Sequence, residues 1–278
     1  MSAREEFEVE ADGGSLRGWT AGSGPDVLLL HGGPGLSYSY LDGLGIELEP
    51  EFHVGAFQQR GLEPSTLEGP FTIVQAIDDV VSVLDGLGWE RALVAGHSWG
   101  GYLAMRLVAD RPERLRGALA IDPLGVVGDG GMAAFATEMG ARAPKEARER
   151  ARELDERAMA GQGTPDDALE SLRIMWGSYF ADPENVPPMP PLTMSLEAYA
   201  GIMSEISADT EGVASRLASS EVPYGIVAGA ASPMPWGQAA RASAELSPHA
   251  FLQVVPGAGH LPWYEVPGSV RDALRRLA

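Results

Sequence analysis

Cysteine is absent from this sequence of 278 residues, and its absence excludes disulfide bonds, a thiol nucleophile and a cysteine-ligated metal site. The sequence also lacks an apolar run long enough to cross a bilayer. Its first six residues, Met-Ser-Ala-Arg-Glu-Glu, do not combine a basic region with an apolar one, so no secretory signal is expected. We therefore predict a cytoplasmic protein that uses neither a metal ion nor another cofactor.

Positive charge is scarce, because 20 lysine and arginine residues stand against 39 aspartate and glutamate residues and leave a net charge of -19. Such a field repels a phosphate backbone and an anionic membrane surface. Nucleic acid and membranes are therefore not expected as partners, and a small molecule or a short peptide is the expected substrate. No pattern in the sequence indicates an oligomeric state.

The most informative stretch starts with a short apolar run at residues 92–95, which predicts a buried strand. Residues 96–100, Gly-His-Ser-Trp-Gly, match the pattern G-x-S-x-G, and a helical pattern covers residues 102–110. Strand, sharp turn and helix form the context in which this pattern presents a nucleophilic serine, and the glycines let strand and helix approach each other. We interpret Ser98 as the nucleophile; the alternative is a glycine-rich turn with an ordinary serine.

Strand and helix patterns alternate along most of the remaining chain. After a predicted hairpin at residues 6–21, the pattern predicts strands at 27–30, 51–57, 115–121, 224–228 and 250–255, and helices at 73–87, 236–246 and 266–277. Repeated strand–helix units predict a mostly parallel sheet flanked by helices. Residues 131–217 show helical patterns without a convincing strand. We therefore predict an α/β core of residues 1–123 and 218–278, with an inserted helical cap at 124–217.

Five residues lie just after predicted strands, and ligands of such sheets bind at the carboxyl ends of the strands. These residues are expected to meet at one edge of the sheet: Gly33, Ser98, Asp122, Ser232 and His260. A serine needs a base, and His260 follows the last strand in the chain order nucleophile, acid, histidine. Of the other histidines, His31 is expected to support its loop and His97 to pack. The backbone N–H groups of Gly33 and Trp99 are the expected oxyanion donors.

Three motifs together resemble the prolyl aminopeptidase (proline iminopeptidase) branch of the α/β-hydrolase fold superfamily: His-Gly-Gly-Pro-Gly at 31–35, Gly-His-Ser-Trp-Gly-Gly at 96–101 and Gly-Ala-Gly-His at 257–260. Arg60 and Gly61 resemble the end of its Asp-x-Arg-Gly segment, with Gln58 in place of the aspartate. The resemblance covers residues 1–122 and 222–278. It implies acyl transfer rather than peptidase activity in particular, because related esterases and amidases share these motifs.

The resemblance also implies acidic residues in two places, namely in the cap and after the seventh strand. Aminopeptidases of this branch place acidic cap residues near the free amine of the substrate. Glu197, Glu205 and Glu211 are open to this role, but a solvated helix face is the preferred interpretation of each. The branch also has an aspartate in a Gly-x-x-Asp pattern after the seventh strand, where this chain has Ser232. Either the site lacks an acid or another residue supplies it. Asp122, at the end of the preceding strand, is the expected replacement, with a cap for the Pro123 turn as its alternative role.

The sequence thus predicts a serine hydrolase that acts on an amide, ester or lactone through an acyl-enzyme, with its pocket under the cap. A serine at the elbow argues against epoxide hydrolase and dehalogenase chemistry, which uses an aspartate there. Two alternatives remain open. One is a non-hydrolytic enzyme of the same fold, such as a cyclase or a lyase, and the other is a small-molecule binding protein.

Overall fold

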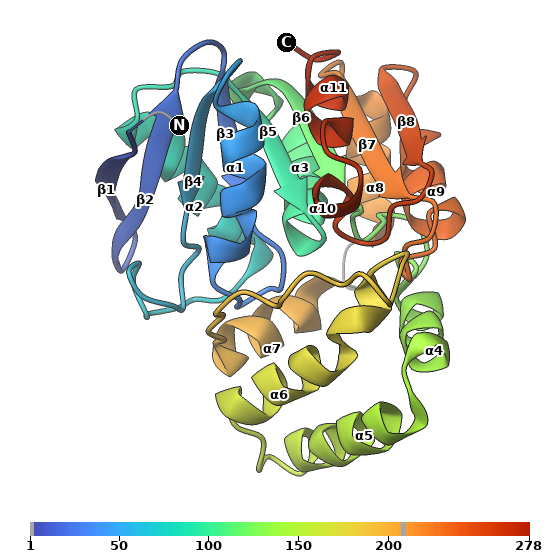
Figure 1. Ribbon diagram of the computed structural model, residues 1–278. Coiled ribbons are helices and arrows are strands. Elements are labelled where there is room, and N and C mark those ends of the chain that lie inside the picture. The colour runs from blue at the N-terminus through green and yellow to red at the C-terminus, as the bar shows by residue number, and fades with distance from the viewer. Residues whose placement is uncertain (1–2, 207–209) are drawn as a thin grey trace.

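The computed structural model describes residues 3–206 and 210–278. Within them, an eight-stranded sheet has the strand order β1-β2-β4-β3-β5-β6-β7-β8 (Figure 1). The pairs β1–β2 and β2–β4 are antiparallel, and the other neighbouring strands are parallel. The strands are β1 (Glu5–Ala11), β2 (Gly14–Gly22), β3 (Asp26–Leu30), β4 (His53–Phe57), β5 (Ala92–His97), β6 (Leu115–Ile121), β7 (Tyr224–Gly229) and β8 (Ala250–Val255). The predicted mostly parallel sheet is confirmed.

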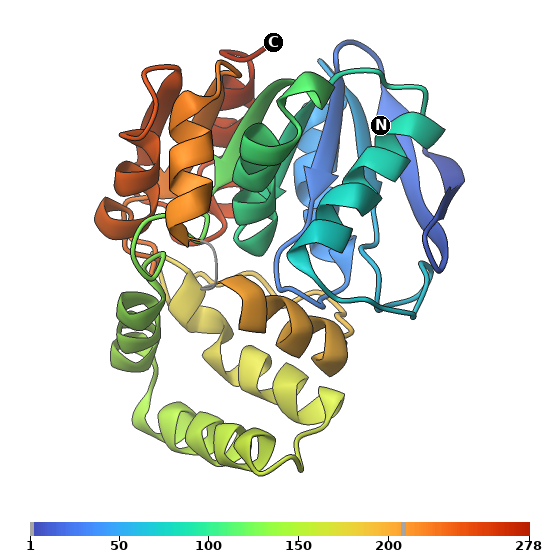
Figure 2. The same ribbon diagram turned by 180° about the vertical axis from the view of Figure 1, so that it is seen from behind.

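Helices cover both faces of the sheet. One face carries α1, α10 and α11 (Figure 1), and the other carries α2, α3 and α8 (Figure 2). Their bounds are α1 (Asp42–Leu48), α2 (Ile73–Gly86), α3 (Trp99–Asp110), α8 (Thr210–Ser219), α10 (Pro262–Glu265) and α11 (Ser269–Leu274). Short helical turns are η1 (Tyr38–Leu41), η2 (Pro112–Arg114), η4 (Gly237–Arg241) and α9 (Ala242–Ala244). The helix predicted at 236–246 is thus a π-helical turn, η4, followed by the short α9.

The apolar runs of the central strands are buried because side chains alternate between the two faces. Leu28 and Leu30 of β3 pack into the layer under α2 and α3, whereas Val27 and Leu29 pack into the layer under α1 and α11. All four side chains are fully buried. A continuous apolar strand is therefore the expected sequence of a sheet covered on both faces.

The helical insertion leaves the core after β6 and lies beyond the carboxyl ends of the parallel strands (Figure 1). It contains α4 (Met132–Arg142), α5 (Lys145–Met159), α6 (Pro165–Met175), the turn η3 (Trp176–Tyr179) and α7 (Leu196–Ile206). The predicted cap range of 124–217 also contains most of α8, but this helix packs on α3 within the core layer (Figure 2). Its fully buried Val213 and Leu217 explain the difference, because they fill the core's apolar layer.

No helix in the described part of the chain is both long and apolar enough to cross a membrane.

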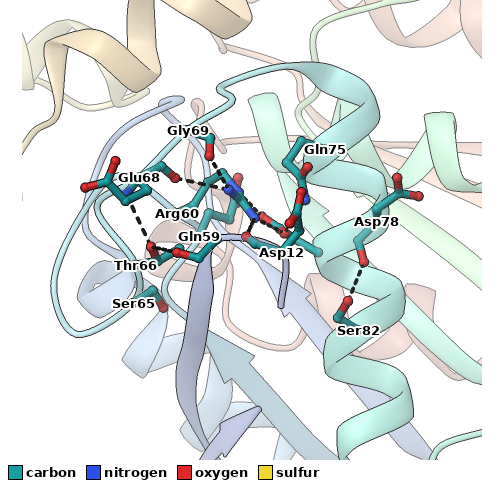
Figure 3. A network of polar contacts seen from close by, with 12 residues as sticks. Asp12, Gln59, Arg60, Ser65, Thr66, Glu68, Gly69, Gln75, Asp78 and Ser82 are labelled. Carbon is teal, nitrogen blue, oxygen red and sulfur yellow. Dashed lines mark hydrogen bonds and ion pairs between the residues drawn. The ribbon is translucent and has the colours of Figure 1, made fainter. Parts of the chain in front are cut away.

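Arg60 holds the segment between β4 and α2 in place. Its guanidinium forms a two-point ion pair with Asp79 of α2, with Nε–Oδ2 and Nη2–Oδ1 distances of 2.6 Å. The remaining N–H groups donate to the carbonyl oxygens of Asp12, Glu68 and Gly69 (Figure 3). All five donors of this buried side chain are therefore satisfied, and Arg60 joins the β1–β2 turn, its own segment and α2.

Candidate active site

Ser98 lies in a strained turn between β5 and α3. Its φ of 56° and ψ of -115° put a non-glycine residue in a sparsely populated region of backbone space. The turn requires glycine two residues before and two residues after Ser98. A Cβ on Gly96 would lie 1.9 Å from the Gly100 oxygen, and a Cβ on Gly100 would lie 2.3 Å from the Leu30 oxygen. Ser98 is only half-buried, so its hydroxyl group is presented at the sheet edge.

Asp122 and His260 meet at the same edge. Asp122 follows β6, and Nδ1 of His260 lies 2.5 Å from its Oδ2 atom. Both side chains are buried. Because neighbouring strands β5 and β6 end together, with His97 opposite Ile121, the residues that follow them are also neighbours. The backbone N–H of Ser98 donates to the carbonyl oxygen of Ile121 at 2.9 Å.

The Asp122 carboxylate receives two further hydrogen bonds. The N–H of Gly229 donates to Oδ1 at 3.0 Å, and the Ser232 hydroxyl donates to Oδ2, the same oxygen that binds His260. The Ser232 oxygen itself accepts the N–H of Met234 at 3.0 Å, which orients the hydroxyl proton toward Asp122. Ser232 thus occupies the position of the expected carboxylate and contacts the carboxylate that comes from β6.

The helical insertion closes over the His260 imidazole. The ring centroid lies 5.9 Å from that of Phe135 in α4 and 5.4 Å from that of Tyr179 in η3. The backbone N–H of His260 donates to the Tyr179 carbonyl oxygen at 2.7 Å. In the described residues, no hydrogen bond joins the Ser98 hydroxyl to His260. Such contacts often tighten only when substrate binds.

The loop after β3 packs directly on the nucleophile, because a Cβ on Gly32 would lie 3.1 Å from the Cβ of Ser98. Gly33 has a φ of 124°, which favours glycine. The N–H of Gly32 is used in a hydrogen bond to the Tyr40 hydroxyl oxygen. Over the described chain, neither the N–H of Gly33 nor that of Trp99, the first residue of α3, has a protein acceptor. These two groups are the ones the sequence analysis selected.

Two glutamines and a histidine brace this loop. Nδ1–H of His31 donates to the Gly32 oxygen, and its Nε2 accepts the N–H of Gln59 at 3.0 Å. Gln59 also donates its amide to the His31 oxygen and accepts the indole N–H of Trp99, both at 2.9 Å. Gln58 adds a bond to the Leu36 carbonyl oxygen. Burial lowers the pKa of His31 to about 4, so the imidazole is neutral, as this bonding requires.

The structure describes the surroundings of two of the three acidic residues considered for amine recognition. The Glu205 carboxylate accepts the N–H of Ile73 at 2.8 Å, so it stabilises the N-terminus of α2 and ties α7 to the core. Glu197 is exposed. The side chain of Glu211 lies outside the described residues. Glu205 therefore makes a contact between cap and core, and no periodicity in the sequence could indicate such a contact.

The structure brings Ser98, Asp122, His260, Gly33 and Trp99 together at the carboxyl edge of the sheet. It adds Tyr40, Gln59 and Tyr179, which the sequence analysis did not identify. A tyrosine hydroxyl, a glutamine amide and a backbone carbonyl carry no recognisable sequence pattern, and only the tertiary packing reveals them. A serine at the same sheet edge as a histidine–carboxylate pair and two N–H donors is an arrangement suited to acyl transfer.

Comparison with known proteins adds family relationships to this geometry. A model of the alpha/beta hydrolase family matches residues 27–273. "Epoxide hydrolase 3" of Siraitia grosvenorii is 30% identical over 123 residues, which make up 42% of this chain and 38% of that protein. The chain thus aligns with well under half the length of this curated relative.

Two solved structures resemble the whole chain. An alpha/beta fold family hydrolase from Bacillus anthracis str. Sterne has a TM-score of 0.75 at 15% identity, with 99% of each chain covered. A proline iminopeptidase-related protein from Thermus thermophilus has a TM-score of 0.68 at 20% identity, with 99% of this chain and 97% of that chain covered. These likenesses confirm the predicted fold, including the helical insertion.

Proposed function

Because the chain belongs to the alpha/beta hydrolase family, we propose that it is a serine hydrolase acting on an amide, ester or lactone through an acyl-enzyme on Ser98. One observation carries the proposal. The carboxylate of Asp122 lies 2.5 Å from Nδ1 of His260, at the same sheet edge as the strained turn of Ser98. This pairing leaves Nε2 as the nitrogen that accepts the serine proton.

The reaction then has two halves. Nε2 of His260 removes the proton of the Ser98 hydroxyl as the oxygen attacks the substrate carbonyl, and the resulting oxyanion accepts the N–H groups of Gly33 and Trp99. Asp122 stabilises the imidazolium, which passes its proton to the leaving group. A water molecule, activated by the same imidazole, attacks the acyl-enzyme and releases the acid and Ser98.

The epoxide hydrolase name of a relative does not transfer with this mechanism. An elbow aspartate opens an epoxide to give an ester, which water hydrolyses at its carbonyl carbon. Ser98 would give an ether, which lacks a carbonyl for water to attack. The residue at the elbow therefore favours carbonyl substrates over epoxides.

Within carbonyl substrates, the site favours uncharged groups over a free amine. Aromatic rings of Phe135 and Tyr179 flank His260, and Glu205 is occupied at the N-terminus of α2. The resemblance to prolyl aminopeptidases nevertheless makes aminoacyl amides a necessary comparison. We expect short acyl esters and lactones to be hydrolysed faster than aminoacyl arylamides.

The experiment combines labelling with a substrate panel. Wild type is treated with a fluorophosphonate probe and assayed on p-nitrophenyl esters, aliphatic lactones and aminoacyl arylamides, with Ser98→Ala as the control. We expect labelling and turnover that the alanine variant loses by a factor on the order of 10⁶, as for removal of a comparable serine. Equal turnover by the variant, or a wild type that is neither labelled nor active, would overturn the proposal in favour of a non-hydrolytic enzyme or a binding protein.

A further inference from the structure

A buried chain of hydrogen bonds connects the three loops of the candidate site. The N–H of Gly32 lies 2.5 Å from the hydroxyl oxygen of Tyr40, which in turn lies 2.9 Å from Nδ1 of His97. Nε2 of His97 lies 2.9 Å from the backbone carbonyl oxygen of His260. Tyr40 and His97 are each only 5% exposed. One chain thus joins the oxyanion loop, the nucleophile elbow and the loop of the base.

The end groups of this chain fix the position of every proton. The His260 carbonyl can only accept, so Nε2 of His97 carries the hydrogen and Nδ1 is the acceptor. Tyr40 must then donate its hydroxyl proton to Nδ1, and its oxygen accepts the N–H of Gly32. Burial holds the pKa of His97 well below its usual range, with the nearby His260 adding to the effect, and the neutral ring that results fits this order.

From this chain we infer that Tyr40 and His97 are positioning residues that hold the oxyanion loop and the base loop in register with Ser98. The inference rests on the proposed hydrolase function. Tyr40 uses the N–H of Gly32, so Gly33 supplies the donor from this loop. It also fixes the peptide between His31 and Gly32, which directly precedes the peptide that carries the Gly33 N–H. An error of about 1 Å in such a site costs on the order of 10²-fold in rate.

Both residues act through the loops that they connect, and the His97 ring also lies against the base, with its centroid 4.7 Å from that of the His260 ring. His97 occupies a variable position of G-x-S-x-G, and its ring packs against Trp263 at 4.9 Å between centroids. The Tyr40 ring packs in the same aromatic cluster, with its centroid 6.4 Å from that of the Trp263 ring. Their aromatic bodies therefore contribute packing, while their polar atoms set the relative position of the loops.

Tyr40→Phe removes the middle link while keeping the ring. We expect kcat per active site to fall roughly 10- to 100-fold with little change in KM, because the oxyanion donors act mainly in the transition state. A trifluoromethyl ketone, whose adduct with Ser98 places an oxyanion in the same position, should bind more weakly by a similar factor. The matched control is Tyr264→Phe, which removes a hydroxyl that contacts the Tyr40 carbonyl outside the chain.

A second pair of variants covers the case in which Tyr40→Phe fails to fold. His97→Gln retains an acceptor and a donor on one side chain, whereas His97→Leu keeps similar bulk and removes both. We expect the glutamine variant to retain substantially more kcat than the leucine variant. The proton order is measured without turnover by ¹⁵N NMR of histidine-labelled protein, which should show His97 as the neutral tautomer protonated at Nε2.

The outcomes separate the two proposals. An active, labelled wild type whose Tyr40→Phe variant keeps kcat and inhibitor affinity overturns the positioning role alone. Equal kcat for His97→Gln and His97→Leu, or a His97 ring protonated at Nδ1, overturns it as well. An inactive, unlabelled wild type with the expected tautomer overturns the hydrolase function, and with it the role of the chain in catalysis.

Discussion

Two arginine–carboxylate pairs in this molecule share one geometry and differ in their surroundings. In the core, Arg60 meets Asp79 through two contacts of 2.6 Å. In the cap, Arg150 of α5 meets Glu170 of α6 through two contacts of 2.7 Å and 3.1 Å. The core side chains are each 3% exposed, whereas those in the cap are 44% and 38% exposed. Geometry alone would rank the pairs as equals.

Burial makes the core and the cap different kinds of structure. An ion removed from water must have its partners supplied by the protein, so losing one partner is costly. An exposed ion recovers water when its partner is lost. Asp122 belongs to the first kind, because it is 1% exposed and bound by His260, Ser232 and a backbone N–H. The core therefore positions charges firmly, whereas water can replace the partners of the exposed ion pairs on α5.

The largest expected effect comes from the buried carboxylate that binds His260. Asp122→Asn should lower kcat by a factor of roughly 10⁴, by analogy with the same change in a serine protease, because the imidazolium loses its charge partner and its tautomer control. The measurement is kcat per titrated active site on the best ester or lactone. Ser232→Ala should cost far less, since a neutral hydroxyl supplies only one hydrogen bond. If kcat of Asp122→Asn fell by less than tenfold, Asp122 would not be the acid that supports His260.

The next effect concerns stability. Asp79→Asn should lower the free energy of unfolding by about 3–5 kcal/mol, because it leaves the buried Arg60 charge without its partner. Urea unfolding followed by circular dichroism measures the loss. Asp78→Asn is the matched control in the same helix, since Asp78 is about half exposed and pairs with Arg111 at the surface. It should change stability by less than about 0.5 kcal/mol, and equal losses in the two variants would contradict the contrast.

The sequence predicted what repeated patterns encode. The strand at 115–121 and the placement of Ser98, Asp122 and His260 after strands follow from apolar runs and glycine-rich turns, because a parallel sheet brings strand ends to one edge. Contacts between segments distant in the chain were not predictable. The hydroxyl of Tyr40 meets His97 only when η1 packs against the end of β5, and the carboxylate of Glu205 meets Ile73 only when the insertion folds onto the core. For the same reason, α8 looked like part of the cap until its packing on α3 was visible.

Protonation of a buried histidine should produce a smaller loss of stability. His31 has a pKa of about 4 in the folded protein and about 6.5 when unfolded, so the unfolded chain binds more protons between these values. The contribution of neutral His31 to the free energy of unfolding is complete above pH 6.5, and it falls by about 3 kcal/mol as the pH drops to 4. The pKa of His97 is also lowered in the folded protein, so protonation of His97 likewise reduces the free energy of unfolding as the pH falls.

The test compares the pH dependence of unfolding in three proteins. Between pH 6.5 and 4, His31→Gln should lose stability less steeply than wild type, because its side chain takes up no proton. His249→Gln replaces an exposed histidine and should follow the wild-type curve. Parallel curves for wild type and His31→Gln would show that protonation of His31 is not linked to unfolding.

The smallest effect is expected at the exposed pair of the cap, Arg150 and Glu170. Arg150→Gln removes the contacts to Glu170 and to Glu153, but water replaces both, so the melting temperature should change by no more than about 1 °C. Arg60→Gln is the same substitution in the core, and it should lower the melting temperature several times more. Raising the salt concentration should narrow the difference between Arg150→Gln and wild type further and leave that between Arg60→Gln and wild type largely unchanged, since salt screens exposed charges far more than buried ones. A drop for Arg150→Gln that matched the one for Arg60→Gln would show that two-point geometry, rather than burial, determines the strength of both pairs.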